Sequence, residues 1–241
     1  MMVTLLKTMI NLSLYNPQVQ NSQKQLLEKY VAAVMAAPAS LGLTATEDPA
    51  EFWERHVLDA LKVVELLPRQ LQEAPLKVID VGSGNGVPGI PAAIALPRWQ
   101  LNLLDSNNKK CGFLDMFCKF NVVKNVRVMA GRAEEFAHQM DMREQFDLAF
   151  ARALGKLPVA LELTLPFLKR EGLLIIPHGN SYKAELANSQ RALKELGAVH
   201  QESIAYQLNA TLSFTVLVFK KNHETPERYP RKSGQPRKRP L

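Results

Sequence analysis

The sequence is poor in residues that could cross-link a small secreted domain or hold a metal ion. It has only two cysteines, Cys111 and Cys118, which would share one face of a predicted helix. We expect them to pack in the core of a protein kept in a reducing compartment. The five histidines show no ligand spacing with the cysteines or with one another. We therefore expect neither a disulfide framework nor a metal site.

Long hydrophobic runs are also missing. No stretch approaches the roughly 18 apolar residues that a membrane-spanning helix needs. Residues 1–10 are apolar, but they lack a basic lead-in and a long hydrophobic segment, so they do not form a convincing signal peptide. The sequence therefore predicts a cytoplasmic protein without a membrane partner.

Positive charge is concentrated at the C-terminal end. Most of the formal net charge of +7 lies after residue 220, where basic residues are interspersed with prolines. We expect such a composition to form no core and to be able to lie along a polyanion. Contact with nucleic-acid phosphate is one interpretation, and a solubilising extension is the other. The basic residues of this tail that are candidates for RNA binding are Arg231, Lys232, Arg237, Lys238 and Arg239.

Residues 78–91 are the most informative segment that is present. Val78, Ile79 and Val81 predict a buried parallel strand, and glycines follow at positions 82, 84, 86 and 89. Without a Cβ atom, glycines let the backbone turn sharply and approach a ligand. A helix is expected to begin near Gly89, with its N-terminus facing the turn. The segment therefore predicts a nucleotide-binding turn.

Two cofactor classes compete for this turn. Residues 84–89 match the pattern G-x-G-x-x-G, which seats a dinucleotide pyrophosphate. With the preceding aspartate and glycine the pattern becomes D-x-G-x-G-x-G, which resembles motif I of S-adenosylmethionine (SAM) methyltransferases. Asp80 could pair with the ammonium group of SAM, and Asp105, at the end of the next strand, could accept hydrogen bonds from ribose hydroxyls. Alternatively, both aspartates only cap the loops that follow.

Strands and helices alternate in the rest of the chain. Strands are predicted at 76–81, 100–104, 126–130, 146–151, 172–177, 199–206 and 212–219, and helices at 18–37, 48–67, 89–96, 109–120, 157–169 and 181–196. The last two strands have no helix between them and should pair antiparallel. We expect an α/β, Rossmann-like SAM-dependent methyltransferase fold with a doubly wound, mostly parallel seven-stranded sheet. The N-terminal helical region would cover residues 1–70, the SAM-binding domain 71–221 and the basic tail 222–241.

Several motifs resemble the RsmG (GidB) family in order and spacing. The turn at 80–91 is followed by Leu104-Asp105-Ser106, Gly131-Arg132-Ala133-Glu134-Glu135 and Ala151-Arg152-Ala153. Arg55-His56 with Asp59 resembles the family's Arg-His-x-x-Asp, and residues 225–241 resemble its basic C-terminus. Members are bacterial and plastid enzymes that methylate the N7 atom of a guanine in small-subunit (16S) ribosomal RNA. The resemblance covers about residues 44–241.

The resemblance implies a SAM-dependent rRNA (guanine-7-)-methyltransferase that acts on 16S ribosomal RNA or on the small ribosomal subunit. It implies SAM contacts from Val87, Glu134 and Arg152, although Val87 could be core and Glu134 a favourable acid in a first helical turn. The predicted cofactor-binding residues are Asp80, Gly82, Gly84, Val87, Asp105, Ser106, Ala133, Glu134 and Arg152. RNA-binding candidates outside the tail are Arg55, His56, Lys109 and Arg132.

No catalytic acid or base is expected, and no catalytic residue is assigned. The N7 atom of guanine carries an in-plane lone pair, so catalysis can consist of positioning donor and acceptor. The sequence has no Asn-Pro-Pro-Tyr-type motif, and it departs from the family pattern mainly in the substrate-facing half, for example at Ala60 and at His178-Gly179. The alternatives are a SAM methyltransferase with another substrate and a non-catalytic RNA-binding relative.

Overall fold

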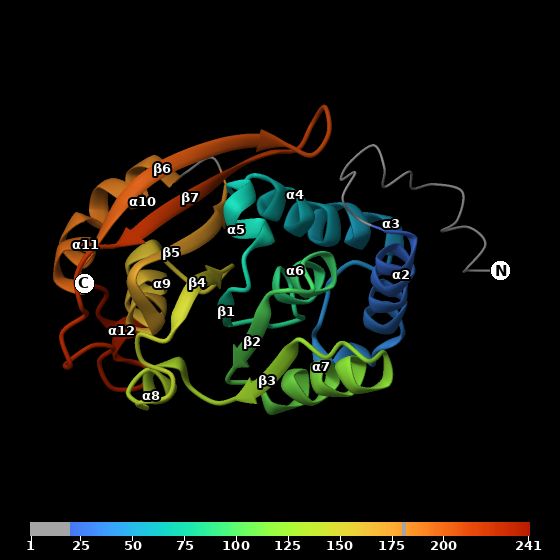
Figure 1. Ribbon diagram of the computed structural model, residues 1–241, viewed down its shortest axis with the longest axis horizontal. Helices are drawn as coiled ribbons and strands as arrows, with labels where there is room; N and C mark the ends of the chain where they lie inside the picture. Colours follow the sequence, from blue (N-terminus) through green and yellow to red (C-terminus); the bar gives the residue numbers. More distant parts are fainter. Residues whose placement is uncertain (1–19, 180–181) are drawn as a thin grey trace.

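The computed structural model describes residues 20–179 and 182–241. The segment considered as a signal peptide and the first residues of the predicted helices 18–37 and 181–196 lie outside this range. The strands are β1 (Lys77–Val81), β2 (Gln100–Asp105), β3 (Val126–Ala130), β4 (Phe146–Ala151), β5 (Leu168–His178), β6 (Ala198–Gln207) and β7 (Ser213–Lys221). They form one seven-stranded sheet in the order β3-β2-β1-β4-β5-β7-β6 (Figure 1).

The sheet is mostly parallel. Strands β1 to β5 pair in parallel, whereas β7 runs antiparallel to both β5 and β6. The described helices are α2 (Asn21–Ala36), α3 (Pro49–Phe52), α4 (Asp59–Glu65), α5 (Arg69–Glu73), α6 (Gly89–Ala95), α7 (Asn108–Phe120), α8 (Ala133–Phe136), α9 (Leu157–Thr164), α10 (Tyr182–Asn188), α11 (Gln190–Leu196) and α12 (Gln235–Lys238). The predicted doubly wound α/β fold is confirmed.

Three predicted helices differ from those in the structure. The predicted helix at 181–196 is interrupted at Ser189, which separates α10 from α11. The predicted helix at 48–67 begins at Pro49, capped by Asp48, but Trp53–Leu58 form a π-helical turn that separates α3 from α4. The predicted helix at 157–169 ends at Thr164, because Pro166 has no N–H and its ring blocks a further α-helical turn. Strand β5 therefore starts at Leu168, earlier than the predicted residue 172.

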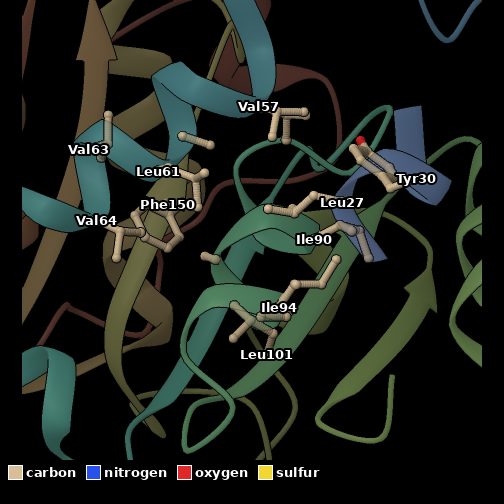
Figure 2. Close-up of a cluster of buried hydrophobic side chains, with 14 of the residues drawn as sticks. Leu27, Tyr30, Val57, Leu61, Val63, Val64, Ile90, Ile94, Leu101 and Phe150 are labelled. Carbon is tan, nitrogen blue, oxygen red and sulfur yellow. The ribbon is translucent and has the colours of Figure 1, made fainter. Parts of the chain in front are cut away.

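Two hydrophobic clusters cover the two faces of the sheet. Along β1 the side chains alternate, so that Val78 packs into one cluster and Ile79 into the other. The first cluster joins the sheet to α2, α4 and α6; Leu27, Leu61 and Ile90 lie in it (Figure 2). The second cluster contains residues of α9 and α11. The helices therefore pack on the two faces of the sheet.

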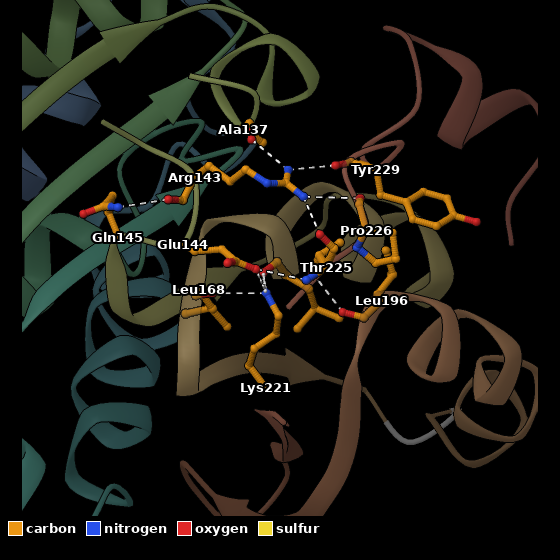
Figure 3. A network of polar contacts seen from close by, with 11 residues as sticks. Ala137, Arg143, Glu144, Gln145, Leu168, Leu196, Lys221, Thr225, Pro226 and Tyr229 are labelled. Carbon is orange, nitrogen blue, oxygen red and sulfur yellow. Dashed lines mark hydrogen bonds and ion pairs between the residues drawn. The ribbon is translucent and has the colours of Figure 1, made fainter. Parts of the chain in front are cut away.

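The expectation that the tail forms no core is wrong. Tyr229 is only 4% exposed and packs into the second cluster, and Pro230 and Pro236 are also buried. The guanidinium of Arg143 donates hydrogen bonds to the carbonyl oxygens of Thr225, Pro226 and Tyr229 (Figure 3). The composition of the tail did not reveal this because the groups that hold it are contributed by the body of the protein.

Candidate active site

Three adjoining cavities lie at the carboxyl ends of β1, β2 and β4, the edge where open α/β sheets bind ligands. The strand-end cavity is lined by residues that include Asp105, Ser106, Ala133 and Glu134. The turn cavity lies on the glycine turn and includes Gly84, Asn85, Val87 and His56. The outer cavity includes Asp59, Ile176, His178 and Phe214. Gly82 lines both the strand-end cavity and the turn cavity, and Arg152 lines both the turn cavity and the outer cavity, so the three cavities are neighbours with shared walls.

The turn after β1 brings bare backbone to this site. Gly82 has a φ of +74°, and its N–H donates to the carbonyl oxygen of Leu104 at 2.7 Å. A Cβ atom at position 82 would lie 2.4 Å from Cδ1 of Leu154. The left-handed conformation therefore favours glycine here, and any Cβ atom would also require the Leu154 side chain to move.

Asp105 links this turn to the end of β2. Its Oδ2 accepts a hydrogen bond from the N–H of Gly84 and its Oδ1 accepts one from the N–H of Asn107, both at 2.8 Å. Asp105 therefore does cap the loops, as one interpretation held. Each carboxylate oxygen has a second lone pair, and Asp105 also lines the strand-end cavity, so it can accept a hydrogen bond from a ligand as well.

Asp80 lies beneath the turn and lines none of the three cavities. It is 1% exposed, and its Oδ2 accepts a hydrogen bond from the N–H of Gly89 at the start of α6. Its Oδ1 is buried and has no hydrogen-bond partner among the described residues. Burial raises the pKa of Asp80 to about 7. The structure thus shows Asp80 holding the first turn of α6, and its contact with a ligand ammonium group stays a prediction.

A buried ionic network forms the boundary between the turn cavity and the outer cavity. Nη1 of Arg152 lies 2.9 Å from Oδ2 of Asp59, and Nη2 donates to the carbonyl oxygen of Arg55 at 3.1 Å. The hydroxyl of Tyr206 donates to Oδ1 of Asp59 at 2.5 Å. Asp59 is 2% exposed, and burial raises its pKa against the opposing effect of Arg152. The network joins α4, β6 and the end of β4.

Sequence reasoning noted Asp59 only as part of a motif and did not select Tyr206 at all. A signal for Asp59 was present, because it interrupts the otherwise apolar run Val57-Leu58-Asp59-Ala60-Leu61. A buried carboxylate in such a run needs a partner. No local signal marks Tyr206, which is on a strand far away in the sequence.

His56 belongs to the turn cavity and is held neutral there. Its ring packs on Phe52, with 4.6 Å between the centroids. Burial, followed by the charges of Arg152 and Arg55, lowers the pKa of His56 to about 4. At neutral pH the imidazole therefore has one N–H donor and one acceptor nitrogen and no charge.

The structure brings most of the predicted site residues together. All of the predicted cofactor residues except Asp80 line the strand-end cavity or the turn cavity: Gly82, Gly84, Val87, Asp105, Ser106, Ala133, Glu134 and Arg152. Among the RNA-binding candidates, Arg132 and Arg237 line the strand-end cavity and His56 lines the turn cavity. Lys109 is exposed, and Lys110, beside it, lines the turn cavity.

Other candidates are placed differently. The side chain of Arg55 pairs with Glu51 at the surface, with 3.3 Å between N and O atoms. Arg231 forms an ion pair with Glu162, which is fully buried, so its guanidinium is already bound within the protein. Lys232, Lys238 and Arg239 are exposed.

Neither a membrane-spanning helix nor a metal-binding cluster is present within residues 20–179 and 182–241. None of the helices there is long and apolar enough to cross a membrane. No group of three or more histidine, cysteine, aspartate or glutamate side chains in the same residues could hold a metal ion.

Solved structures with the same fold include methyltransferases and related transferases. The chain resembles M. jannaschii TYW2 in complex with AdoMet, with a TM-score of 0.53 and 15% identity over 69% of this chain and 76% of that one. A branched-chain polyamine synthase mutein from Thermus thermophilus has a TM-score of 0.58 and 16% identity over 83% of this chain and 64% of the other. At these identities the likeness shows the fold alone.

Sequence relatives are much closer. A protein from Oenococcus oeni called ribosomal RNA small subunit methyltransferase G is 36% identical over 92% of this chain and 91% of its own length. A protein of the same name from Nostoc punctiforme is 37% identical, over 94% and 93%. The family model described as GidB, rRNA small subunit methyltransferase G, matches residues 23–211. The chain therefore belongs to the rRNA small subunit methyltransferase G family.

Proposed function

We propose that this protein transfers a methyl group from SAM to the N7 atom of a guanine in 16S ribosomal RNA, in the cytoplasm. The observation that carries the proposal is the group of adjoining cavities at the carboxyl ends of β1, β2 and β4, which residues from the family motifs line. The relatives named as small-subunit RNA methyltransferases match more than nine-tenths of the chain, which supports the choice of RNA as acceptor.

The residues present fit SAM. Asp105 offers carboxylate oxygens for ribose hydroxyls, and Ala133 with Glu134 borders the place for the adenine in the strand-end cavity. Gly82 provides bare backbone between that cavity and the turn cavity, where the amino-acid part of SAM would lie. When bound, SAM supplies an electrophilic methyl group on a sulfonium sulfur.

The chain's own residues would then position the acceptor. Arg152 borders both the turn cavity and the outer cavity, and its ion pair with Asp59 holds it there. Phe214 offers the outer cavity a ring on which a base can stack. Because the guanine N7 lone pair needs no deprotonation, positioning of this kind is sufficient for transfer.

Neutral His56 suits this reaction electrostatically. The methyl donor is a cation, and guanine becomes cationic when N7 is methylated. A protonated imidazole beside them would repel both, whereas the lowered pKa of His56 keeps the ring uncharged.

The proposal is tested by methyl transfer from tritium-labelled SAM. Small ribosomal subunits that lack the modification, naked 16S RNA and fully modified subunits would each be incubated with the protein. Nucleosides from digested RNA would then be separated by chromatography. We expect label in 7-methylguanosine from unmodified substrate only. Label in another nucleoside would refute the N7 assignment, and no label in any RNA would favour the non-catalytic relative.

A further inference from the structure

The last residues of the chain reach the strand-end cavity. Gly234 and Arg237 line it together with Asp105, Arg132 and Glu134. In Figure 1, α12 lies next to α8 and α9. Segment 232–241 therefore contributes residues to the lining of this cavity, although it follows the last strand of the sheet.

Three contacts fix where this segment lies. Arg231 binds the buried Glu162 through its backbone N–H at 2.9 Å and its guanidinium at 2.8 and 2.5 Å. The N–H of Gly234 donates to Oε1 of Glu134 at 2.8 Å, and the hydroxyl of Ser233 donates to Glu135 at 3.2 Å. Because these anchors lie on α8 and α9, the tail is attached to the elements that also border the cavity.

We propose that segment 232–241 forms a wall of the cofactor site and that Arg237 is a cofactor-contacting residue at its adenosine end. The proposal rests on the proposed function, since it takes the strand-end cavity to hold the adenosine of SAM. Arg237, Lys238 and Arg239 are all exposed, but of these three only Arg237 lines the cavity. A planar guanidinium can lie on the face of an adenine or donate to its ring nitrogens.

The charge of SAM makes the direction of the effect diagnostic. SAM has a sulfonium and an ammonium against one carboxylate, so it is a net cation, whereas S-adenosylhomocysteine has no sulfonium charge. Removing an arginine that acts only through its charge should therefore strengthen SAM binding and leave S-adenosylhomocysteine binding nearly unchanged. Removing an arginine that contacts the adenosine should instead weaken the binding of both ligands.

The test compares Arg237→Ala with the matched control Arg239→Ala by titration calorimetry against SAM and against S-adenosylhomocysteine. Both variants lose one positive charge from the same short segment. We expect Arg237→Ala to lower the affinity for both ligands about tenfold, as for loss of a hydrogen bond from a charged group. Arg239→Ala should change both affinities by less than about twofold. Equal affinities in the two variants, or tighter SAM binding by Arg237→Ala, would overturn the proposal.

A truncation after Arg231 provides a second test that keeps the buried ion pair with Glu162. The shortened chain should stay folded, with some loss of thermal stability because Pro236 and the hydrogen bonds of Ser233 and Gly234 are removed, and it should bind SAM about tenfold more weakly or worse. Unchanged SAM affinity would refute the proposal that segment 232–241 forms a wall of the cofactor site. The full-length chain separates the two proposals, since SAM binding without methyl transfer to RNA would refute only the proposed function. Failure to bind SAM at all would refute both.

Discussion

Replacement of Arg231 by alanine should destabilise the protein, although the residue lies in a basic, proline-rich tail. Its partner Glu162 is completely buried, and three hydrogen bonds from Arg231 satisfy the carboxylate. Removing one member of a buried ion pair typically costs about 3–5 kcal/mol, because the other charge is left without a partner. For a chain of this size that loss corresponds to a fall in Tm of roughly 10 °C.

Thermal and urea unfolding would measure the effect, with Lys232→Ala as the control for loss of a neighbouring exposed charge. The double variant Arg231→Ala with Glu162→Gln should recover much of the loss, because no buried charge remains. A Tm equal to that of Lys232→Ala would show that the tail is not anchored and would refute the reasoning.

Two further predictions concern the site. Asp105→Ala should weaken SAM binding by about 1.5–3 kcal/mol, since the carboxylate would lose hydrogen bonds to the ribose; calorimetry showing a loss under about half a kcal/mol would leave Asp105 only its role as a loop cap. The imidazole of His56 should titrate near pH 4 by NMR, as its lowered pKa requires. The folded state then binds fewer protons than the unfolded state between about pH 4 and 6.5, so stability should fall as the pH drops through this window. His56→Gln should make that fall shallower, and an equal slope in both proteins would contradict the shift.

The sheet could be predicted because its signals are local. Apolar strands separated by helical periodicity, and two final strands without a helix between them, determine the alternation and the antiparallel edge. Local signals also have limits. Helical periodicity continued past residue 164 although Pro166 marks the end of α9 locally, whereas the early start of β5 depends on its pairing with β4.

The cofactor half of the site was predictable for the same reason. The glycine turn and Asp105 sit at the ends of neighbouring parallel strands, so their sequence positions already imply that they meet. The part of the site that would hold the methyl acceptor was less predictable. Asp59 meets Tyr206 and Arg152 only because α4 packs beside β6 and β4, and no pattern near any one of them reports this pairing.

The tail shows most clearly where sequence reasoning ends. Its own composition correctly indicated basic charge and the absence of a regular hydrophobic pattern. Whether such a segment is ordered depends on partners elsewhere, here the buried carboxylate of Glu162 and the guanidinium of Arg143. The sequence by itself determined the α/β sheet, the glycine turn and the family, because these are encoded in short contiguous patterns. Only the tertiary structure decided that Arg237 borders the cofactor cavity and that Asp59 holds Arg152, because those contacts join residues from distant parts of the chain.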